Sequence, residues 1–308
     1  MHTPHWKAVI NAMKSGGYYD NIMAAGPELD RVKSYIRAFA KEQEIKPSNP
    51  LLNPAYPVFP GLNHRPFPDP AEFEAVRILE QSFDTIREEA CALKLDSFFR
   101  YIPRPTGLLS KIWLKLNPEY IIKTWTMYVF YYMGVNFETK TLRCPETMKI
   151  IQSLPDVCLD YPWNDAIFSM HEPGTHLPAH CSIDNLRVRI HLGINIPEDC
   201  EIRVGDETRT WEEGKCLLIE DSIEHEVWNR SDRNRLILIV DLWHPDLTAI
   251  EREALTAGFR KSDVRMTFYQ ERIRNTSAPA MYVDYLVDEF RRQDEEDVFR
   301  KYWNSQGA

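Results

Sequence analysis

The stretch RVRIHLGINI, from Arg187 to Ile196, decides the fold class of this chain. Apolar and polar side chains alternate along it. The apolar set is Val188, Ile190, Leu192 and Ile194, and the polar set is Arg187, Arg189, His191, Gly193 and Asn195. Because successive side chains of a strand point to opposite faces, the pattern predicts a strand with one core face and one polar face. That polar face is either a solvated sheet surface or the wall of a functional site, and the pattern leaves both open.

Short segments of the same kind surround this strand between Ile167 and Asp241. They read FSM, EIRV, TRTW, KCLLI, HEVWN and RLILIVD, with Gly- or Asp-containing turns between them. Short strands at intervals of roughly ten residues are typical of an antiparallel sandwich or barrel. The segment WTMYVFYYM, from Trp125 to Met133, is rich in β-branched and aromatic residues and is a further predicted strand. We therefore expect a mainly β fold with flanking helices.

The N-terminal region is predicted to be helical and then extended. Residues 28–41 carry apolar side chains at helical spacing, at Leu29, Val32, Ile36 and Phe39. Eight of the 21 prolines then fall between Pro47 and Pro70, which excludes helix interiors and central strands there. After them a helix is predicted to start at the N-cap Asp69, with Glu72 at the capping-box position, and to continue to Leu93.

The C-terminal region returns to helical patterns. One short helix is predicted earlier in the chain, over residues 145–154. In the C-terminal tail, Thr248 with Glu251 forms a second capping box, which marks the start of a helix. We expect three parts: a helical and extended arm over residues 1–58, a β domain with its own N-terminal helix over 59–247, and a helical extension over 248–308. The aromatic-rich segment 268–285 either covers the barrel mouth as a lid or serves packing or dimer contacts.

The composition excludes several classes of function. The 308 residues carry 46 acidic and 37 basic side chains, a formal net charge of −9, so no excess of cations is available for nucleic acid or anionic membranes. No apolar stretch is long enough to span a bilayer. Six cysteines without a CxxC pair indicate reduced thiols. We expect a cytoplasmic protein with neither nucleic-acid nor membrane partners, while its oligomeric state stays open.

Histidines concentrate in the β-rich region, where six of the nine lie between His171 and His244. His180 and His225 each stand at a strand edge, 45 residues apart, so two strands of a small barrel could bring them together. Two histidines and a carboxylate hold iron in non-haem oxygenases, but the usual carboxylate position, two residues after the first histidine, is Ser182. Iron and zinc therefore both stay open. We expect structural roles for three others, His171, His176 and His244.

Arginines could provide a site for a dianion. Arg235 begins the strand RLILIVD, so an inward guanidinium there could bind a carboxylate with two hydrogen bonds. Arg189 and His191 share the polar face of their strand and could meet the other end of the same dianion. Ser169, on the segment FSM, carries no signal of its own.

Together these segments resemble a known family. FSMHEPGTHLPAHCSIDNLRVRIHLGINIP, ETRTWEEGKCLLIEDSIEHEVWN and RLILIVDLWHPDL are similar to the aspartyl/asparaginyl β-hydroxylase family of Fe(II)- and 2-oxoglutarate-dependent dioxygenases. The resemblance runs from about Phe59 to Leu247 and is dense after Ile167. It implies a double-stranded β-helix, the jelly roll of cupin-like proteins. It also implies oxidation of 2-oxoglutarate by O₂ to succinate and carbon dioxide, coupled to hydroxylation of an unactivated C–H bond.

The resemblance also implies roles for particular residues. His180 and His225 would hold the iron, and the family lacks the carboxylate ligand that Ser182 also fails to supply. Ser169 and Arg235 would bind the distal carboxylate of 2-oxoglutarate, with Arg189 and His191 near its metal-chelating end. Its position four residues before His225 makes Asp221 a further candidate, which could contact substrate or orient a ligand histidine. Cys181 is not expected to be a ligand, because neighbouring side chains in a strand point to opposite faces.

The substrate is less defined than the reaction. Family members that act on Asp or Asn side chains carry a lysine two residues before the serine, and here that position is Ile167. We expect a small-molecule or peptidyl substrate: an amino acid, a peptide or a small specialised metabolite. Two alternatives stay open. The same oxidant could serve desaturation, cyclisation or halogenation, or the barrel could be a metal-free or zinc-bound binding module.

Overall fold

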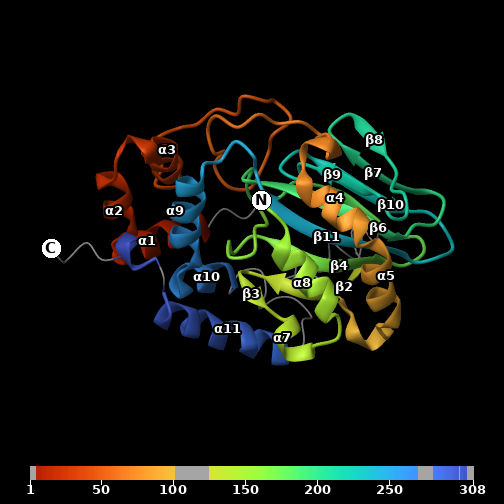
Figure 1. The fold of residues 1–308 in the computed structure, drawn as a ribbon. Helices are drawn as coiled ribbons and strands as arrows, with labels where there is room; N and C mark the ends of the chain where they lie inside the picture. The colour runs from red at the N-terminus through yellow and green to blue at the C-terminus, as the bar shows by residue number, and fades with distance from the viewer. Residues whose placement is uncertain (1–4, 101–124, 270–279, 298, 304–308) are drawn as a thin grey trace, which may run out of the picture.

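The structure is a computed structural model that describes residues 5–100, 125–269, 280–297 and 299–303. Its strands form two antiparallel sheets (Figure 1). The larger sheet has the order β1-β2-β4-β11-β6-β9, with β3 paired to β2, and the smaller has the order β5-β10-β7-β8. The strands are β1 (Phe99–Arg100), β2 (Trp125–Tyr132), β3 (Val135–Asn136), β4 (Asp165–His171), β5 (His176–His180), β6 (Arg187–Asn195), β7 (Cys200–Val204), β8 (Glu207–Arg209), β9 (Cys216–Ile219), β10 (His225–Asn229) and β11 (Arg235–Trp243).

The pairing of these strands is that of a jelly roll. From β4 onward the first strand pairs with the last, β11, and the second, β5, pairs with the last but one, β10. Inside these pairs, β6 lies beside β11 and β9, while β7 lies beside β10 and β8. Two four-stranded sheets connected in this order make the double-stranded β-helix. The expected fold class is therefore confirmed.

The alternating stretch forms β6, and each of its two faces is buried. The apolar face packs beneath α4 (Glu74–Gln81) and α5 (Phe83–Ala92), which lie across the larger sheet (Figure 1). The polar face points into the space between the two sheets, where Arg187 and His191 are only 3% and 4% exposed. The alternative of a solvated sheet face is therefore wrong.

The helix predicted from Asp69 to Leu93 is three shorter elements. Pro70–Glu72 is a 3-10 turn capped by the Asp69 side chain, and α4 and α5 follow with a break at Ser82. Glu72 bonds to Arg65 instead of completing a capping box. The break lets α4 pack on β6 and β9 and α5 on β6 and α8 (Pro145–Ser153). A twisted sheet rotates away from a straight helix, so two short helices cover more of it than one long helix would.

The two terminal extensions pack against each other. Figure 1 shows α1 (His5–Ser15), α2 (Tyr18–Ala24) and α3 (Asp30–Phe39) beside α9 (Ala249–Arg260) and α10 (Ser262–Phe268). Arg31 of α3 binds both carboxylate oxygens of Glu251 of α9, at 2.8 and 2.6 Å. The capping box of Thr248 and Glu251 is confirmed, and so is the helix expected within residues 28–41.

The remaining predictions for the tail concern α11 (Ala280–Glu295) and the residues before it. Tyr285 donates a hydrogen bond to the carbonyl of Asn136, which places α11 against β3. Residues 270–279, the centre of the predicted lid, lie outside the described residues. Within the described ranges, no helix is long and apolar enough to cross a membrane.

Candidate functional site

Two histidines from neighbouring strands lie side by side at the edge of the smaller sheet. His180 ends β5, His225 begins β10, and the two residues are direct partners in the antiparallel register. Their ring centroids are 4.1 Å apart, with an angle of 53° between the ring planes. His180 is open to solvent, whereas His225 is buried. The structure thus brings together the pair that the 45-residue spacing suggested.

Hydrogen bonds to the backbone fix the tautomer of both rings. The Nδ1 of His180 lies 2.7 Å from the carbonyl oxygen of Pro178, and the Nδ1 of His225 lies 3.0 Å from that of Ile223. A carbonyl only accepts, so each Nδ1 carries the proton and each Nε2 keeps its lone pair. Burial lowers the pKa of His225 to about 3, and partial loss of solvation within the barrel mouth lowers the pKa of His180 although that residue is still exposed, so both rings are neutral at pH 7. Neutral imidazoles held in this way are the form that binds a metal ion.

Ser182 and Asp221 connect the segments that carry the two histidines. The backbone N–H of Ser182 donates to the carbonyl of Asp221 at 2.7 Å, and the Ser182 hydroxyl accepts from Arg187 at 2.8 Å. The Asp221 carboxylate is buried, and its charge offsets part of the lowering of the pKa of both histidines. It lies 3.3 Å from Nε of Arg189. Backbone carbonyls therefore orient the two rings, and Asp221 supplies a nearby negative charge.

Arg189 is surrounded by carboxylates. It bonds to Asp241 at 2.7 and 2.9 Å and to Asp165 at 2.8 Å, in addition to its contact with Asp221. Burial alone would lower the pKa of Arg189, but these three carboxylates outweigh burial and raise it. Its charge is thus already neutralised within the protein. The predicted contact between Arg189 and a cosubstrate stays a prediction, and that contact would have to compete with these ion pairs.

Arg235 has the opposite surroundings. It is 2% exposed at the start of β11, and its Nε and Nη1 atoms have no hydrogen-bond partner among the residues that the structure describes. Its guanidinium carbon lies 4.8 Å from the ring centre of Trp211. Burial lowers the pKa of Arg235 to about 9, which still leaves it charged at pH 7. A buried cation without a carboxylate partner is costly, so this position is suited to an anion from outside the chain.

Three side chains near Arg235 offer further hydrogen-bonding atoms. The Nδ1 of His171 and the Nε2 of His191 are buried without partners. The Arg235 charge contributes to lowering the pKa of each imidazole, although burial is the largest cause. Ser169 accepts a 3.0 Å hydrogen bond from Trp125, which leaves its own hydroxyl proton without an acceptor among the described residues. Arg235, Ser169 and His191 are therefore buried polar side chains on the side of the larger sheet that faces the smaller sheet, and the space beside them is the candidate cosubstrate pocket.

His171 stands beside these side chains, and the structural role that the sequence suggested for it stays a prediction. It pairs directly with Arg235 across β4 and β11. One signal could have revealed it: His171 stands two residues after Ser169 on the same strand, so both side chains point to the same side of the sheet. The histidine had no recognisable motif of its own, and its neighbour Arg235 is 64 positions away in the chain.

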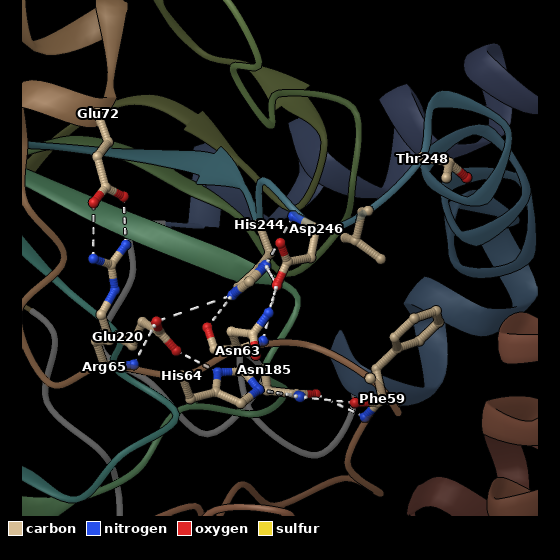
Figure 2. A network of polar contacts seen from close by, with 12 residues as sticks. Phe59, Asn63, His64, Arg65, Glu72, Asn185, Glu220, His244, Asp246 and Thr248 are labelled. Carbon is tan, nitrogen blue, oxygen red and sulfur yellow. Dashed lines mark hydrogen bonds and ion pairs between the residues drawn. The ribbon is translucent and has the colours of Figure 1, made fainter.

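A second cluster, formed by His64, Glu220 and His244, has its potential ligand atoms within 4.8 Å of one another. Figure 2 shows the polar contacts that these three side chains make. His64 contacts Glu220 through Nδ1, and its Nε2 accepts a hydrogen bond from Asn185 at 3.0 Å. A metal at this cluster would therefore have to displace hydrogen bonds that are already formed.

The other histidine of this cluster is saturated as well. Nε2 of His244 donates to the carbonyl of Asn63 at 3.1 Å, and its Nδ1 accepts from the backbone N–H of Asp246 at 3.2 Å (Figure 2). Glu220 also accepts from the backbone N–H of Arg65. The cluster is thus a hydrogen-bonded network that attaches the extended segment around residues 59–65 to the barrel, in line with the structural role expected for His244.

Comparisons with known proteins agree with this geometry. Residues 80–245 match the family model described as aspartyl/asparaginyl beta-hydroxylase. The chain is 35% identical to human aspartyl/asparaginyl beta-hydroxylase over 201 residues, which are 64% of this chain and 25% of that protein. It is 34% identical over 213 residues to human aspartate beta-hydroxylase domain-containing protein 1, covering 68% and 52%. With domain-containing protein 2 of Xenopus tropicalis it shares 33% over 235 residues, covering 75% and 60%. The chain spans between a quarter and three fifths of the length of these relatives.

Proposed function

The chain belongs to the aspartyl/asparaginyl beta-hydroxylase family, and we propose that it is an Fe(II)- and 2-oxoglutarate-dependent dioxygenase. Its substrate would be an amino acid, a peptide or a small specialised metabolite that is hydroxylated at an unactivated C–H bond. One observation carries the proposal. Two neutral histidines with free Nε2 lone pairs share the barrel with a buried arginine that has no carboxylate partner.

His180 and His225 are the residues that would hold the iron. Nitrogen ligands from two imidazoles suit Fe(II), and the backbone hydrogen bonds at Nδ1 keep both rings turned for binding. When bound, iron and 2-oxoglutarate together supply the oxidant for C–H hydroxylation, and the cosubstrate leaves as succinate and carbon dioxide. Asp221 places a negative charge near the two histidines, which favours the binding of a divalent cation.

Arg235 is the counter-ion proposed for the distal carboxylate of 2-oxoglutarate. Its unpartnered Nε and Nη1 atoms supply donors, and the Ser169 hydroxyl and the His191 Nε2–H supply two more. A carboxylate at this position would remove the cost of an unpaired buried charge, so the pocket favours a dianion over a neutral ligand. Arg189 remains the proposed contact for the other end of the cosubstrate.

Apolar residues line the barrel between these polar groups. Ile167, Ile237 and Ile239 belong to the interior core cluster and are each less than 7% exposed. Ile167 stands on the same side of β4 as Ser169. These side chains exclude water from the space where the reaction would occur, which strengthens each electrostatic contact inside.

The proposal is tested by the formation of succinate from 2-oxoglutarate under O₂. The purified protein is assayed with and without Fe(II), first alone and then with amino acids, peptides and fractions of cell extract. We expect turnover to require Fe(II) and to disappear in His225→Ala. The matched control is His176→Ala, a histidine that lies on β5 like His180 but stacks on Trp228 and bonds to Glu226. Turnover should persist in that control.

A different result would change the assignment. Absence of turnover in all fractions, together with no binding of Mn(II) or 2-oxoglutarate, would contradict the dioxygenase and favour a binding module. Zinc binding at His180 and His225 without any affinity for 2-oxoglutarate would favour a zinc-bound barrel. Stimulation of succinate formation by one fraction would lead to the substrate.

A further inference from the structure

We propose that Trp211 is a positioning residue that prepares the cosubstrate pocket before 2-oxoglutarate binds. The inference rests on the proposed function, because it concerns the same pocket. Trp211 is 3% exposed in the segment between β8 and β9. Its indole contacts both of the groups that would bind the anion: the N–H donates to His191, and the ring face lies against Arg235.

The first contact determines where His191 carries its proton. Nε1 of Trp211 lies 3.2 Å from Nδ1 of His191. An indole N–H is only a donor, so Nδ1 of His191 must accept, and the proton of the neutral imidazole stands on Nε2. That Nε2 is buried without a partner. His191 is therefore held as a neutral donor whose hydrogen bond is still unmade, which is the arrangement that an incoming carboxylate oxygen requires.

The second contact holds the guanidinium of Arg235. The ring centre of Trp211 lies 4.8 Å from its Cζ atom, within the range of a cation–π interaction. No described carboxylate pairs with Arg235, and the indole face is a contact that supports its charge. The Trp211 side chain thus fixes the proton of His191 on Nε2 and holds the guanidinium of Arg235 in place, so neither group has to reorganise when the anion binds.

Gly193 explains how the Trp211 segment comes close enough to make these contacts. A Cβ atom at Gly193 would lie 2.2 Å from the carbonyl oxygen of Glu212, the residue after Trp211. Two backbone hydrogen bonds join the segments there, from Gly193 to Lys215 and from Gly214 to Gly193. The glycine within the alternating strand β6 is therefore required by the close approach of this segment.

The experiment measures 2-oxoglutarate binding to the full-length protein by calorimetry, with Mn(II) in place of iron. Trp211→Phe keeps an aromatic ring but removes the N–H, and Trp211→Leu removes both contacts. We expect Kd for 2-oxoglutarate to rise about 2- to 10-fold in Trp211→Phe, as for the loss of one hydrogen bond. Trp211→Leu should lose a further factor of about 2 to 30. The affinity for Mn(II) alone should not change.

The control is Trp243→Phe. Trp243 is also a buried indole of the barrel, but within the described residues it packs on Tyr161 and makes no hydrogen bond or cation–π contact with His191 or Arg235. It should bind 2-oxoglutarate like the unmodified protein. A second readout is the ¹⁵N spectrum of labelled histidine, assigned with His191→Gln. It should show the Nε2–H tautomer of His191 in the unmodified protein and a mixture of tautomers in Trp211→Phe.

The outcomes separate this inference from the proposed function. If the unmodified protein does not bind 2-oxoglutarate, the proposed function fails. If it binds, but Trp211→Phe binds equally well and keeps the Nε2–H tautomer, the positioning role is overturned. If Trp211→Phe does not fold, the tautomer in the unmodified protein decides, because an Nδ1–H form of His191 overturns the proposal.

Discussion

Arg235→Met should make the ligand-free protein more stable while it abolishes 2-oxoglutarate binding. Methionine fills a similar volume without a charge. Burial lowers the pKa of Arg235 from about 12.5 to about 9, and each pKa unit corresponds to about 1.4 kcal/mol, so the buried charge costs at most about 5 kcal/mol. The contact with Trp211 offsets about 1 to 2 kcal/mol of this. We expect a net gain of about 1 to 4 kcal/mol in the free energy of unfolding.

The pH dependence gives a further check on this reasoning. The pKa of Arg235 is lower in the folded protein than in the unfolded chain, so its charge destabilises the fold fully below about pH 9. Above pH 9 the folded protein releases the proton while the unfolded chain keeps it, and the cost declines. The advantage of Arg235→Met should therefore be constant between pH 7 and 8.5 and should decrease above that range.

The assay is urea denaturation and the melting temperature Tm, first in EDTA and then with Mn(II) and 2-oxoglutarate. In EDTA, Tm of Arg235→Met should rise by about 3 to 10 °C. The ligands should stabilise the unmodified protein, by about 3 kcal/mol at a hundred times Kd, and should not stabilise the variant.

The matched control is Arg187→Met. Arg187 is buried to the same degree, but it bonds to Asp241 at 2.9 Å and to Asp184 at 3.4 Å. Its removal leaves the buried Asp184 without a cationic partner among the described residues and leaves Asp241 with Arg189 alone, which should cost about 3 to 5 kcal/mol. A loss of stability in Arg235→Met as large as that in Arg187→Met would refute the reasoning, because Arg235 would then be a structural charge.

Three further perturbations test the electrostatics and the terminal layer. Burial holds the pKa of His171 well below its ordinary value, so as the pH falls below about 6.5 the unfolded chain takes up a proton there before the folded protein does, and stability declines. His171→Asn should lose that share of the pH dependence in urea denaturation, and an identical dependence would contradict it. His64→Ala should lower the free energy of unfolding by about 3 kcal/mol because Glu220 loses a buried partner. Calorimetry should show the same number of bound Mn(II) ions as in the unmodified protein. A variant that binds one ion fewer would place a metal at His64 and His244. Thr248→Ala removes the N-cap of α9 and should cost about 1 kcal/mol; Thr248→Ser is the control, and an equal loss there would mean that the cap is not the cause.

Much of the fold was predictable because its signals are local. Alternation along β6 predicted a strand with two different faces, and the Thr248 capping box predicted where α9 begins. The break at Ser82 was not predictable, since an uninterrupted apolar stripe fits one helix as well as two. The strand β5 was also missed, although His180 was placed at a strand edge. Its five residues, HLPAH, show no alternation of apolar and polar side chains.

In the candidate site, too, some features were predictable from the sequence and others were not. Spacing and residue type were enough to single out His180, His225 and Arg235, because imidazole pairs and inward arginines are rare enough to be informative. The partners of Arg189 were not foreseeable, since Asp165, Asp221 and Asp241 come from three separate segments. Sequence reasoning assigned Arg235 and Arg189 to opposite ends of the same cosubstrate, but it did not show that Arg189 is ion-paired whereas Arg235 has no carboxylate partner among the described residues.

Residue type and periodicity predicted a mainly β sandwich or barrel and suggested the histidine pair, because these depend on chemistry carried by each residue and on patterns within about ten positions. The resemblance of longer segments implied the jelly roll and the family. Tertiary structure alone decided which charges are paired and which side chains complete the pocket. His171 and Trp211 reach Arg235 only after β4, β11 and the segment before β9 are brought together. Whether a buried charge is neutralised depends on atoms a few ångströms away, and those atoms belong to residues up to 64 positions distant in the sequence.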